Sequence, residues 1–142
     1  MNLKKYIAQM RYFASILIFA LFCLPVMAGE KEDVRAAING QFQAFLAEDV
    51  PRAFTYASPL IRSMFGSPQK FGEMVQRGYP MVWRPSVIKF LEQKETFQGR
   101  TQDVQIYDAS GGVHYLRYFL AQTSNGWKIS GVQLMDLADI SV

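Results

Sequence analysis

The chain contains 142 residues, of which 50% are hydrophobic, 14% aromatic and 19% charged, and its formal net charge is +3. This length allows one domain at most, since domains typically run to ~100–200 residues, and the hydrophobic fraction excludes a disordered chain. Three of the fifteen basic residues, Lys4, Lys5 and Arg11, lie in residues 1–28, so residues 29–142 carry twelve basic and twelve acidic residues. A domain without net charge lacks the basic excess that nucleic-acid binding usually needs, and no nucleic-acid partner is expected.

Residues 1–28 have the layout of a cleaved secretory signal peptide. Their basic residues precede an apolar run at residues 13–24, and Val26 and Ala28 place small side chains just before the expected cut at Gly29. An uncleaved anchor is the alternative, but the run falls short of the ~20 residues that span hydrocarbon. Either interpretation exports the rest of the chain, to the periplasm or beyond the cell. We therefore expect residues 29–142 to form one exported domain with no stable membrane insertion after cleavage.

Cys23, the only cysteine, lies inside the apolar run of the expected signal peptide. Phe22 precedes it, whereas a lipoprotein needs a small residue there, so lipid anchoring is not expected. Cleavage before Gly29 leaves a mature chain without cysteine. Disulfides, thiolate catalysis and zinc–thiolate sites are then excluded.

The first part of the expected domain has a helical pattern. Between Lys31 and Glu48 the apolar residues recur at steps of three and four, which predicts an amphipathic helix with its apolar face inward. Gly40 interrupts this helix and allows a bend or a close approach of another segment, at a cost of ~1 kcal/mol relative to alanine.

Three short helices are predicted next, at residues 52–57, 60–65 and 69–77. Asp49, Ser58 and Ser67 each provide a capping side chain at or near a proline suited to the first turn. Gly66 and Gly78 stand where C-caps are expected. Apolar residues of all three helices, including Leu60, Ile61, Met64 and Phe65, are expected to form the inner surface of a compact helical cluster.

After Tyr79 the apolar pattern changes towards a period of two, which is typical of strands. The predicted strands are Val87–Phe97, Thr101–Tyr107, Val113–Gln122 and Gly126–Met135. Short connections predict that neighbouring strands pair antiparallel as a meander. Helices followed by a curved antiparallel sheet make an α+β fold.

The last strand contains a change of phase. Trp127 and Ile129 share one face, but Val132 and Leu134 fall on the other if the strand is regular. One extra residue near Ser130-Gly131 restores the match, so the sequence predicts a β-bulge that bends this strand.

Two segments resemble known families. The core signature of a bacterial family of short exported proteins, classified as a domain of unknown function, is matched by Ser58–Pro68, Phe71, Met74-Val75, Arg77-Gly78-Tyr79, Val82 and Arg84-Pro85. Gly126–Val132 resembles the final strand common in the nuclear transport factor 2-like (cystatin-like) superfamily. The resemblance covers residues 33–135 and implies a cone of helices wrapped by a bent sheet, often with a pocket at its mouth and often a homodimer. Ketosteroid isomerase, scytalone dehydratase and non-catalytic binders share that frame, so the resemblance implies no particular reaction.

The chain offers few residues for metal or acid–base chemistry. His114 is the only histidine, which excludes three-histidine zinc sites, and no other cluster has metal-ligand spacing, so no metal or cofactor is expected. His114 is either a general base inside the cone or a solvent-facing hairpin residue. Asp103 and Asp108, with the hydroxyls of Tyr107 and Tyr118, are either an isomerase-type set or surface acids. No catalytic residue is assigned.

A basic and aromatic set lies in and just after the helical cluster: Tyr56, Arg62, Arg77, Tyr79, Trp83 and Arg84. Arginines and tyrosine hydroxyls at a pocket rim bind carboxylate or phosphate through forked hydrogen bonds. The structural alternatives are a Glu73–Arg77 pair on one helix, capping or pairing of Arg62 and Arg84 with Glu48 or Asp49, and Trp83 as a core residue.

These features predict an exported, non-catalytic module that binds a small organic or anionic ligand between its helices and its concave sheet. Two alternatives stay open. One is an isomerase, dehydratase or hydrolase that uses an interior carboxylate or His114 within the cone. The other is a structural partner in an envelope complex, which requires an exposed apolar patch on the outer face of the sheet.

Overall fold

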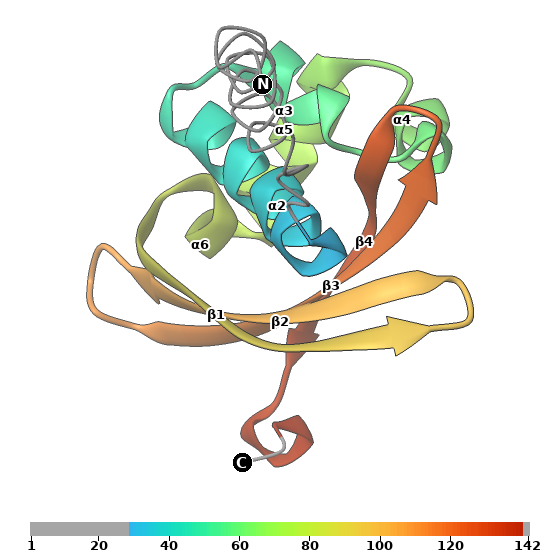
Figure 1. Ribbon diagram of the computed structural model, residues 1–142. Helices are drawn as coiled ribbons and strands as arrows, with labels where there is room; N and C mark the ends of the chain where they lie inside the picture. The colour runs from blue at the N-terminus through green and yellow to red at the C-terminus, as the bar shows by residue number, and fades with distance from the viewer. Residues whose placement is uncertain (1–28, 141–142) are drawn as a thin grey trace, which may run out of the picture.

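The computed structural model describes residues 29–140, which begin with helices and end with a sheet (Figure 1). The elements are α2 (Glu30–Leu46), α3 (Val50–Thr55), α4 (Pro59–Phe65), α5 (Pro68–Gly78), α6 (Pro80–Trp83), β1 (Pro85–Thr96), β2 (Gly99–Asp108), β3 (Val113–Thr123), β4 (Gly126–Met135) and the 3-10 helix η2 (Leu137–Asp139). The predicted signal peptide lies outside the described residues. Within residues 29–140, no helix has the length and apolar character needed to cross a membrane.

The short helices begin at the predicted caps. The side chains of Asp49, Ser58 and Ser67 each accept a hydrogen bond from a backbone N–H three residues later, and a proline stands in the first turn of each helix. Gly66 is the predicted C-cap of α4, at a φ of 73° that favours glycine. The prediction that Gly78 is a C-cap is wrong. Gly78 is the last residue of α5, and Tyr79 is both the C-cap of α5 and the N-cap of α6.

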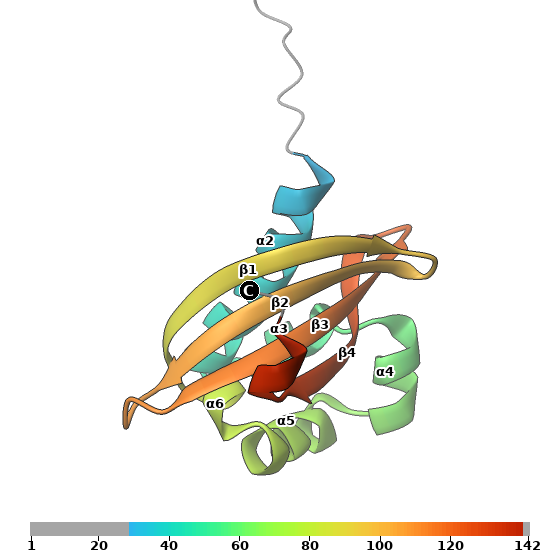
Figure 2. The same ribbon diagram turned by 90° about the horizontal axis from the view of Figure 1, so that it is seen from below.

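The sheet is an antiparallel meander in the order β1-β2-β3-β4, which confirms the predicted α+β fold. Strand β4 contains the predicted bulge: Phe119 pairs with Gly131 and Leu120 with Ile129, so Ser130 has no opposite residue. The Ser130 hydroxyl donates to the Phe119 carbonyl at 3.1 Å. The long strands bow around the helices (Figure 2), as bulged strands do.

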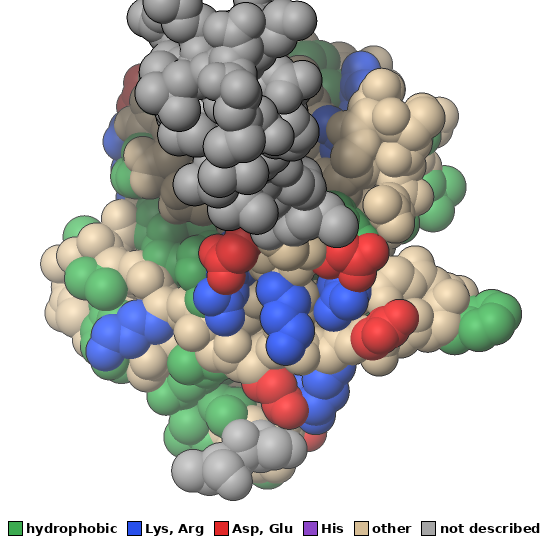
Figure 3. Space-filling view, viewed as in Figure 1, with side chains coloured by type: hydrophobic (Ala, Val, Ile, Leu, Met, Phe, Trp, Pro, Cys, Tyr) green, Lys and Arg blue, Asp and Glu red, His purple; other side chains and the backbone are tan. Residues whose placement is uncertain are grey.

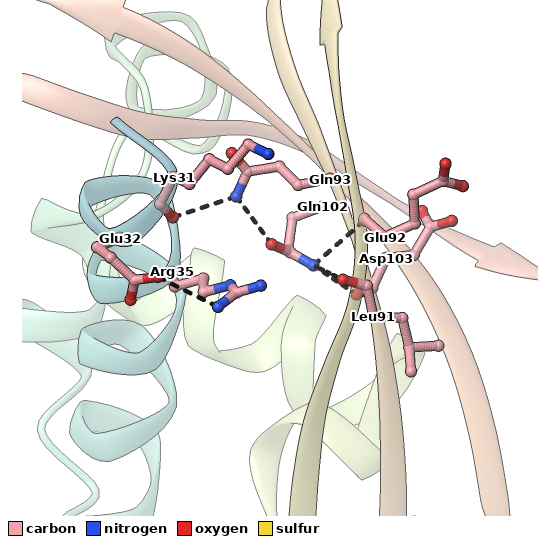
Figure 4. A network of polar contacts seen from close by, with 8 residues as sticks. All are labelled: Lys31, Glu32, Arg35, Leu91, Glu92, Gln93, Gln102 and Asp103. Atoms are coloured by element: carbon pink, nitrogen blue, oxygen red, sulfur yellow. Dashed lines mark hydrogen bonds and ion pairs between the residues drawn. The ribbon is translucent and has the colours of Figure 1, made fainter. Parts of the chain in front are cut away.

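A second bulge, in β1, was not predicted. Phe90 pairs with Val104 and Gln93 with Gln102, so Leu91 and Glu92 face Asp103 alone. The fully buried Gln102 amide donates to the Leu91 and Glu92 carbonyls, at 3.2 Å each, and thereby holds the bulge (Figure 4). The Gln93 amide donates to the Lys31 carbonyl of α2 at 3.2 Å and to Gln102 Oε1 at 2.9 Å. These contacts fix the bend of the sheet against the first turn of α2.

Strand β1 is an edge of the sheet and carries charged side chains. Figure 3 shows basic side chains gathered along β1 and the start of α2, with acidic side chains among them. Several form ion pairs: Arg35 with Glu32 at 3.2 Å, Lys94 with Glu92 at 3.1 Å and Arg100 with Glu30 at 2.7 Å. Charges on an edge strand prevent further strand pairing.

The core lies between α2 and the concave face of the sheet. The α2 side chains Val34, Ile38, Phe42 and Phe45 are at most 1% exposed. The Phe42 ring meets Tyr118 of β3 edge-on, with ring centroids 5.9 Å apart. On the other side of α2, α3 and α5 add Phe54 and Phe71, whose rings are 5.3 Å apart.

Gly40 of α2 is required by a close approach, as the sequence allows. The Tyr56 ring covers it so closely that an added Cβ would lie 2.4 Å from Tyr56 Cζ. The ring therefore occupies the volume that any larger side chain needs.

Candidate ligand-binding site

A cavity of about 280 Å³ lies between α2, α4, α5 and β4. Most of its wall is apolar, with Phe45 from α2, Ile61 and Phe65 from α4, Met74 from α5 and Val132 from β4. Among the lining side chains, only those of Gln41 and Tyr79 carry a polar group, and none carries a charge. The site therefore suits an uncharged and largely apolar occupant.

The bulged part of β4 positions the cavity. The segment that joins α3 to α4 pairs with β4 just before the bulge: the Ile129 N–H donates to the Tyr56 carbonyl, and the Ser58 N–H donates to the Ile129 carbonyl, both at 2.8 Å. After Ser130 the strand changes phase, and Gly131 and Val132 line the cavity. The bulge thus tethers the start of α4 and also shapes the wall beneath it.

Helix α4 forms the outer wall of the cavity. It lies beside β4 at the margin of the helical layer (Figures 1 and 2). None of its seven residues is buried, and Leu60 and Met64 are 67% and 68% exposed. The prediction that Leu60 belongs to the inner surface of the helical cluster is wrong. The i, i+4 pairs Leu60/Met64 and Ile61/Phe65 lie on adjacent stripes of α4, and only the Ile61/Phe65 stripe is half-buried. Met64 lines the cavity with part of its side chain but is largely exposed. Few buried contacts imply that α4 opens at a lower free energy than the core.

The two polar side chains at the cavity, Gln41 and Tyr79, form long hydrogen bonds to backbone carbonyls. Gln41 Nε2 donates to the Ala53 carbonyl at 3.2 Å. The Tyr79 hydroxyl donates to the Val132 carbonyl at 3.3 Å, longer than the ~2.7–2.8 Å typical of a hydroxyl donor.

Tyr118 lies behind Val132 of this wall, on the neighbouring strand β3. It is the register partner of Val132 across the β3–β4 ladder and is 1% exposed. Its hydroxyl is buried and has no hydrogen-bond partner in the described part of the chain. Burial raises the pKa of the Tyr118 hydroxyl far above its usual value, and the nearby Tyr79 adds to this. Tyr118 is therefore neutral at any ordinary pH.

The three arginines predicted to bind an anion do not meet at the cavity. Arg84 forms an ion pair with Glu48, which confirms the structural alternative for that residue. The Arg62 guanidinium lies over the Phe54 ring, 5.5 Å from its centroid. Arg77 is exposed on α5, and no ion pair among residues 29–140 includes it. A role for these arginines in binding stays a prediction.

Of the three aromatic residues in the predicted set, the structure places only Tyr79 in the cavity wall. The Tyr56 ring covers Gly40, and Lys128 Nζ lies 6.0 Å from the centroid of that ring. Trp83 is half-buried and packs on Phe45, with ring centroids 5.4 Å apart. Both aromatic residues support the helical layer.

The candidate acid–base residues also lie away from the cavity. His114 is half-buried, not solvent-facing, with its Nε2 2.7 Å from Asp108 Oδ2 near α6. Asp108 Oδ1 also accepts from the Ser110 hydroxyl and from the N–H groups of Ser110 and Gly112. These hydrogen bonds, that of His114 first, hold the pKa of Asp108 well below its usual value.

Asp103 lies on the outer face of the sheet, because its strand neighbour Val104 faces the core. It is buried, not a free surface acid, and accepts two hydrogen bonds from Arg117, at 2.7 and 2.8 Å. This pairing raises the pKa of Arg117. Within residues 29–140, no group of three His, Cys, Asp or Glu side chains is placed to hold a metal ion.

The fold and this site define an α+β domain with an apolar cavity between its helices and its bent sheet. A family model described as Domain of unknown function (DUF4864) matches residues 27–142, and the chain belongs to this family. The resemblance to a domain of unknown function is thereby confirmed. No curated protein and no solved structure matches the chain significantly.

Proposed function

We propose that this domain is a binding module for a small, uncharged and largely apolar molecule, held in the cavity beneath α4. The volume of about 280 Å³ is close to the lower end of the ~300–1,000 Å³ found for ligand pockets. It is also nearly twice the ~150 Å³ of an apolar cavity that accepts benzene. A molecule of about two fused rings, or an aliphatic one of similar size, has the matching dimensions.

One observation supports the proposal above the others: one wall of the cavity is a helix with no buried residue. Met64 both lines the cavity and is largely exposed, so it stands at the mouth. Ser58 and Gly66 cap the two ends of α4, which allows the helix to move as one short unit. A ligand can enter at this mouth, beside α4, without breaking the core around α2.

The walls favour binding over acid–base catalysis. General acid–base chemistry needs a side chain that exchanges a proton within reach of the substrate. Neither a carboxylate nor an imidazole is among the lining side chains of residues 29–140. An enzyme remains the second hypothesis, with His114 and Asp108 as its residues.

A titration followed at methionine methyl groups tests the binding proposal. Met64 and Met74 line the cavity, whereas Met81 and Met135 lie outside it and serve as internal controls. The probe is naphthalene: ten carbon atoms at roughly 0.5 kcal/mol each correspond to a Kd of about 0.2 mM. We expect the ¹³C-methyl signals of Met64 and Met74 to shift and saturate while those of Met81 and Met135 stay in place. Equal shifts at all four, or none, would contradict the proposal.

Two tryptophan variants on α4 provide a matched control. Ile61 lines the cavity and Leu60, its neighbour, points to solvent. Ile61→Trp fills the cavity and is expected to weaken naphthalene binding at least tenfold, whereas Leu60→Trp leaves it within twofold. The same loss in both variants would place the binding elsewhere.

We also propose, from residues 1–28, that the module works outside the cytoplasm. The full chain, expressed in a Gram-negative host, is expected in the periplasmic fraction with Gly29 as its first residue. Recovery of the uncut chain from the cytoplasm, determined by fractionation and N-terminal sequencing, would contradict this part of the proposal.

A further inference from the structure

The chemistry of the cavity wall restricts the occupant further. No charged side chain lines the cavity, and the nitrogen of Gln41 is already used by the Ala53 carbonyl. A carboxylate or an ammonium group inside would lose its hydration without gaining an opposite charge. The polar part of the ligand is therefore uncharged.

Tyr79 is the best-placed group to bind such a polar part. Its backbone is fixed at the junction of α5 and α6, where its N–H donates to the Val75 carbonyl at 2.8 Å and its carbonyl accepts from Val82 at 2.9 Å. Its hydroxyl makes only the long bond to the Val132 carbonyl. That hydroxyl can turn from Val132 to a ligand oxygen at little cost.

Tyr118, whose hydroxyl has no partner within residues 29–140, does not itself line the cavity but is the register partner of Val132, which does. It lies behind Val132, the residue whose carbonyl now holds Tyr79, and its ring is fixed edge-on by Phe42. A buried hydroxyl without a partner is unfavourable and calls for an explanation. One explanation is that the Tyr118 hydroxyl forms a hydrogen bond only when a ligand occupies the cavity.

We infer that the cavity selects apolar molecules with one uncharged oxygen, a hydroxyl or carbonyl group, that binds the Tyr79 hydroxyl, with Tyr118 as a positioning residue behind it. This inference rests on the proposed binding function. It differs from the anion expected from the sequence, because Arg62, Arg77 and Arg84 do not line the cavity.

Probes that share one ring system but differ in their polar group test the inference. Naphthalene, 2-naphthol and 2-naphthoate are titrated into the full chain and followed at Met64 and Met74. We expect 2-naphthol to bind about fivefold more tightly than naphthalene, which corresponds to one neutral hydrogen bond of ~1 kcal/mol, and 2-naphthoate to bind at least tenfold more weakly. If naphthalene binds but naphthol gains nothing, or naphthoate binds most tightly, the inference is overturned while the binding function stands. If no probe binds, the binding function itself fails.

Three phenylalanine variants assign the residues. Tyr79→Phe is expected to reduce the preference for 2-naphthol over naphthalene, taken as the ratio of the two Kd values in the same variant, to less than twofold. Tyr118→Phe is expected to reduce that preference about twofold. Tyr115→Phe, on the outer face where its hydroxyl bonds to Gln105, is the control and should change neither value. If Tyr118→Phe leaves the preference for 2-naphthol over naphthalene unchanged, Tyr118 is not a positioning residue. If Tyr79→Phe leaves that preference unchanged, the inference is overturned.

A measurement on the unmodified chain guards against a variant that does not fold. 2-Methoxynaphthalene accepts a hydrogen bond but cannot donate one. We expect it to keep the advantage of 2-naphthol over naphthalene, because Tyr79 acts as the donor. Binding no tighter than that of naphthalene would overturn this assignment.

Discussion

Helices α2 and α4 are both rich in apolar residues, yet they have opposite relations to the rest of the molecule. Over its 17 residues α2 places Val34, Ile38, Phe42 and Phe45 on one buried stripe against the sheet. With seven residues, α4 buries none and rests over a cavity. The apolar stripe of α2 is covered along its length by the sheet, whereas α4 lies at the margin of the helical layer, where little packs on its outer side (Figure 2). Helix α2 thus stabilises the fold, whereas α4 contributes little to stability and can form a wall of a ligand site.

Truncating one phenylalanine in each helix gives the largest expected difference. Phe42 is 1% exposed in the core, whereas Phe65 is half-buried on α4. Phe42→Ala is expected to lower the free energy of unfolding by about 3–5 kcal/mol, the range for a buried phenylalanine. Phe65→Ala should lower it by about 1 kcal/mol, because the Phe65 ring packs on Phe71 on one side and faces the cavity on another. Urea unfolding measures both, and equal losses would contradict the loose attachment of α4.

Features that depend on neighbouring residues could be predicted from the sequence, whereas those that depend on contacts between distant segments could not. The caps at Asp49, Ser58 and Ser67 and the bulge at Ser130 depend on neighbouring residues, and all four were predicted. A pocket between the helices and the concave sheet was expected from the sequence, but its lining side chains were not, because they come together only where α2, α4, α5 and β4 meet in space. The bulge in β1 was missed for the same reason, since the amide that holds it belongs to Gln102 on the next strand.

The candidate site was predicted less well than the fold, for a related reason. Charged residues such as Arg62 and Arg84 draw attention in a sequence, but long side chains find partners on nearby segments, as Arg84 does with Glu48. Tyr79, the predicted residue that reaches the cavity, owes its place to the turn between α5 and α6. The sequence did contain one indication of the cavity wall. Between the capping residues Ser58 and Gly66 lies a helix of only seven residues, four of which have apolar side chains.

Two glycine substitutions sharpen the contrast between packed and open helix surface. Gly40→Ala in α2 would improve helix propensity by ~1 kcal/mol, but the added Cβ lies 2.4 Å from Tyr56 Cζ and must displace that ring. We expect a net loss of about 1–2 kcal/mol in the free energy of unfolding. At Gly78, by contrast, an added Cβ meets no atom within 4 Å, so Gly78→Ala should raise stability by about 0.5 kcal/mol. Thermal unfolding compares the two variants, and a gain in Gly40→Ala would show that Tyr56 moves freely.

Tyr118→Phe separates stability from binding within the core itself. Because the lost hydroxyl is buried without a partner among the described residues, its removal should raise the free energy of unfolding by about 1 kcal/mol. The same change should reduce the preference for 2-naphthol, so stability rises as selectivity falls. Tyr115→Phe removes a hydroxyl that does have a partner, Gln105, and should lower stability slightly. A loss of stability in Tyr118→Phe would show that its hydroxyl is already hydrogen-bonded, for example to a buried water.

The smallest effect is expected at the β2–β3 turn, which takes part in neither the core nor the cavity. Its Asp108 carboxylate accepts hydrogen bonds from His114, Ser110 and Gly112, which lower its pKa in the folded state. The folded chain therefore holds this carboxylate in its charged form more strongly than the unfolded chain does. The resulting stabilisation is fully present above the unfolded pKa of about 3.9 and is lost as the pH falls below it.

In Asp108→Asn this contribution is absent at every pH. The difference in free energy of unfolding between wild type and Asp108→Asn should thus be constant above about pH 5 and shrink as the pH falls towards 2. Asp136→Asn is the control, because that exposed residue forms no ion pair within residues 29–140. Urea unfolding at a series of pH values measures both differences. If the difference in free energy of unfolding between wild type and Asp108→Asn stays constant down to pH 2, the turn does not lower the pKa of Asp108. His114 would then be held by some other group.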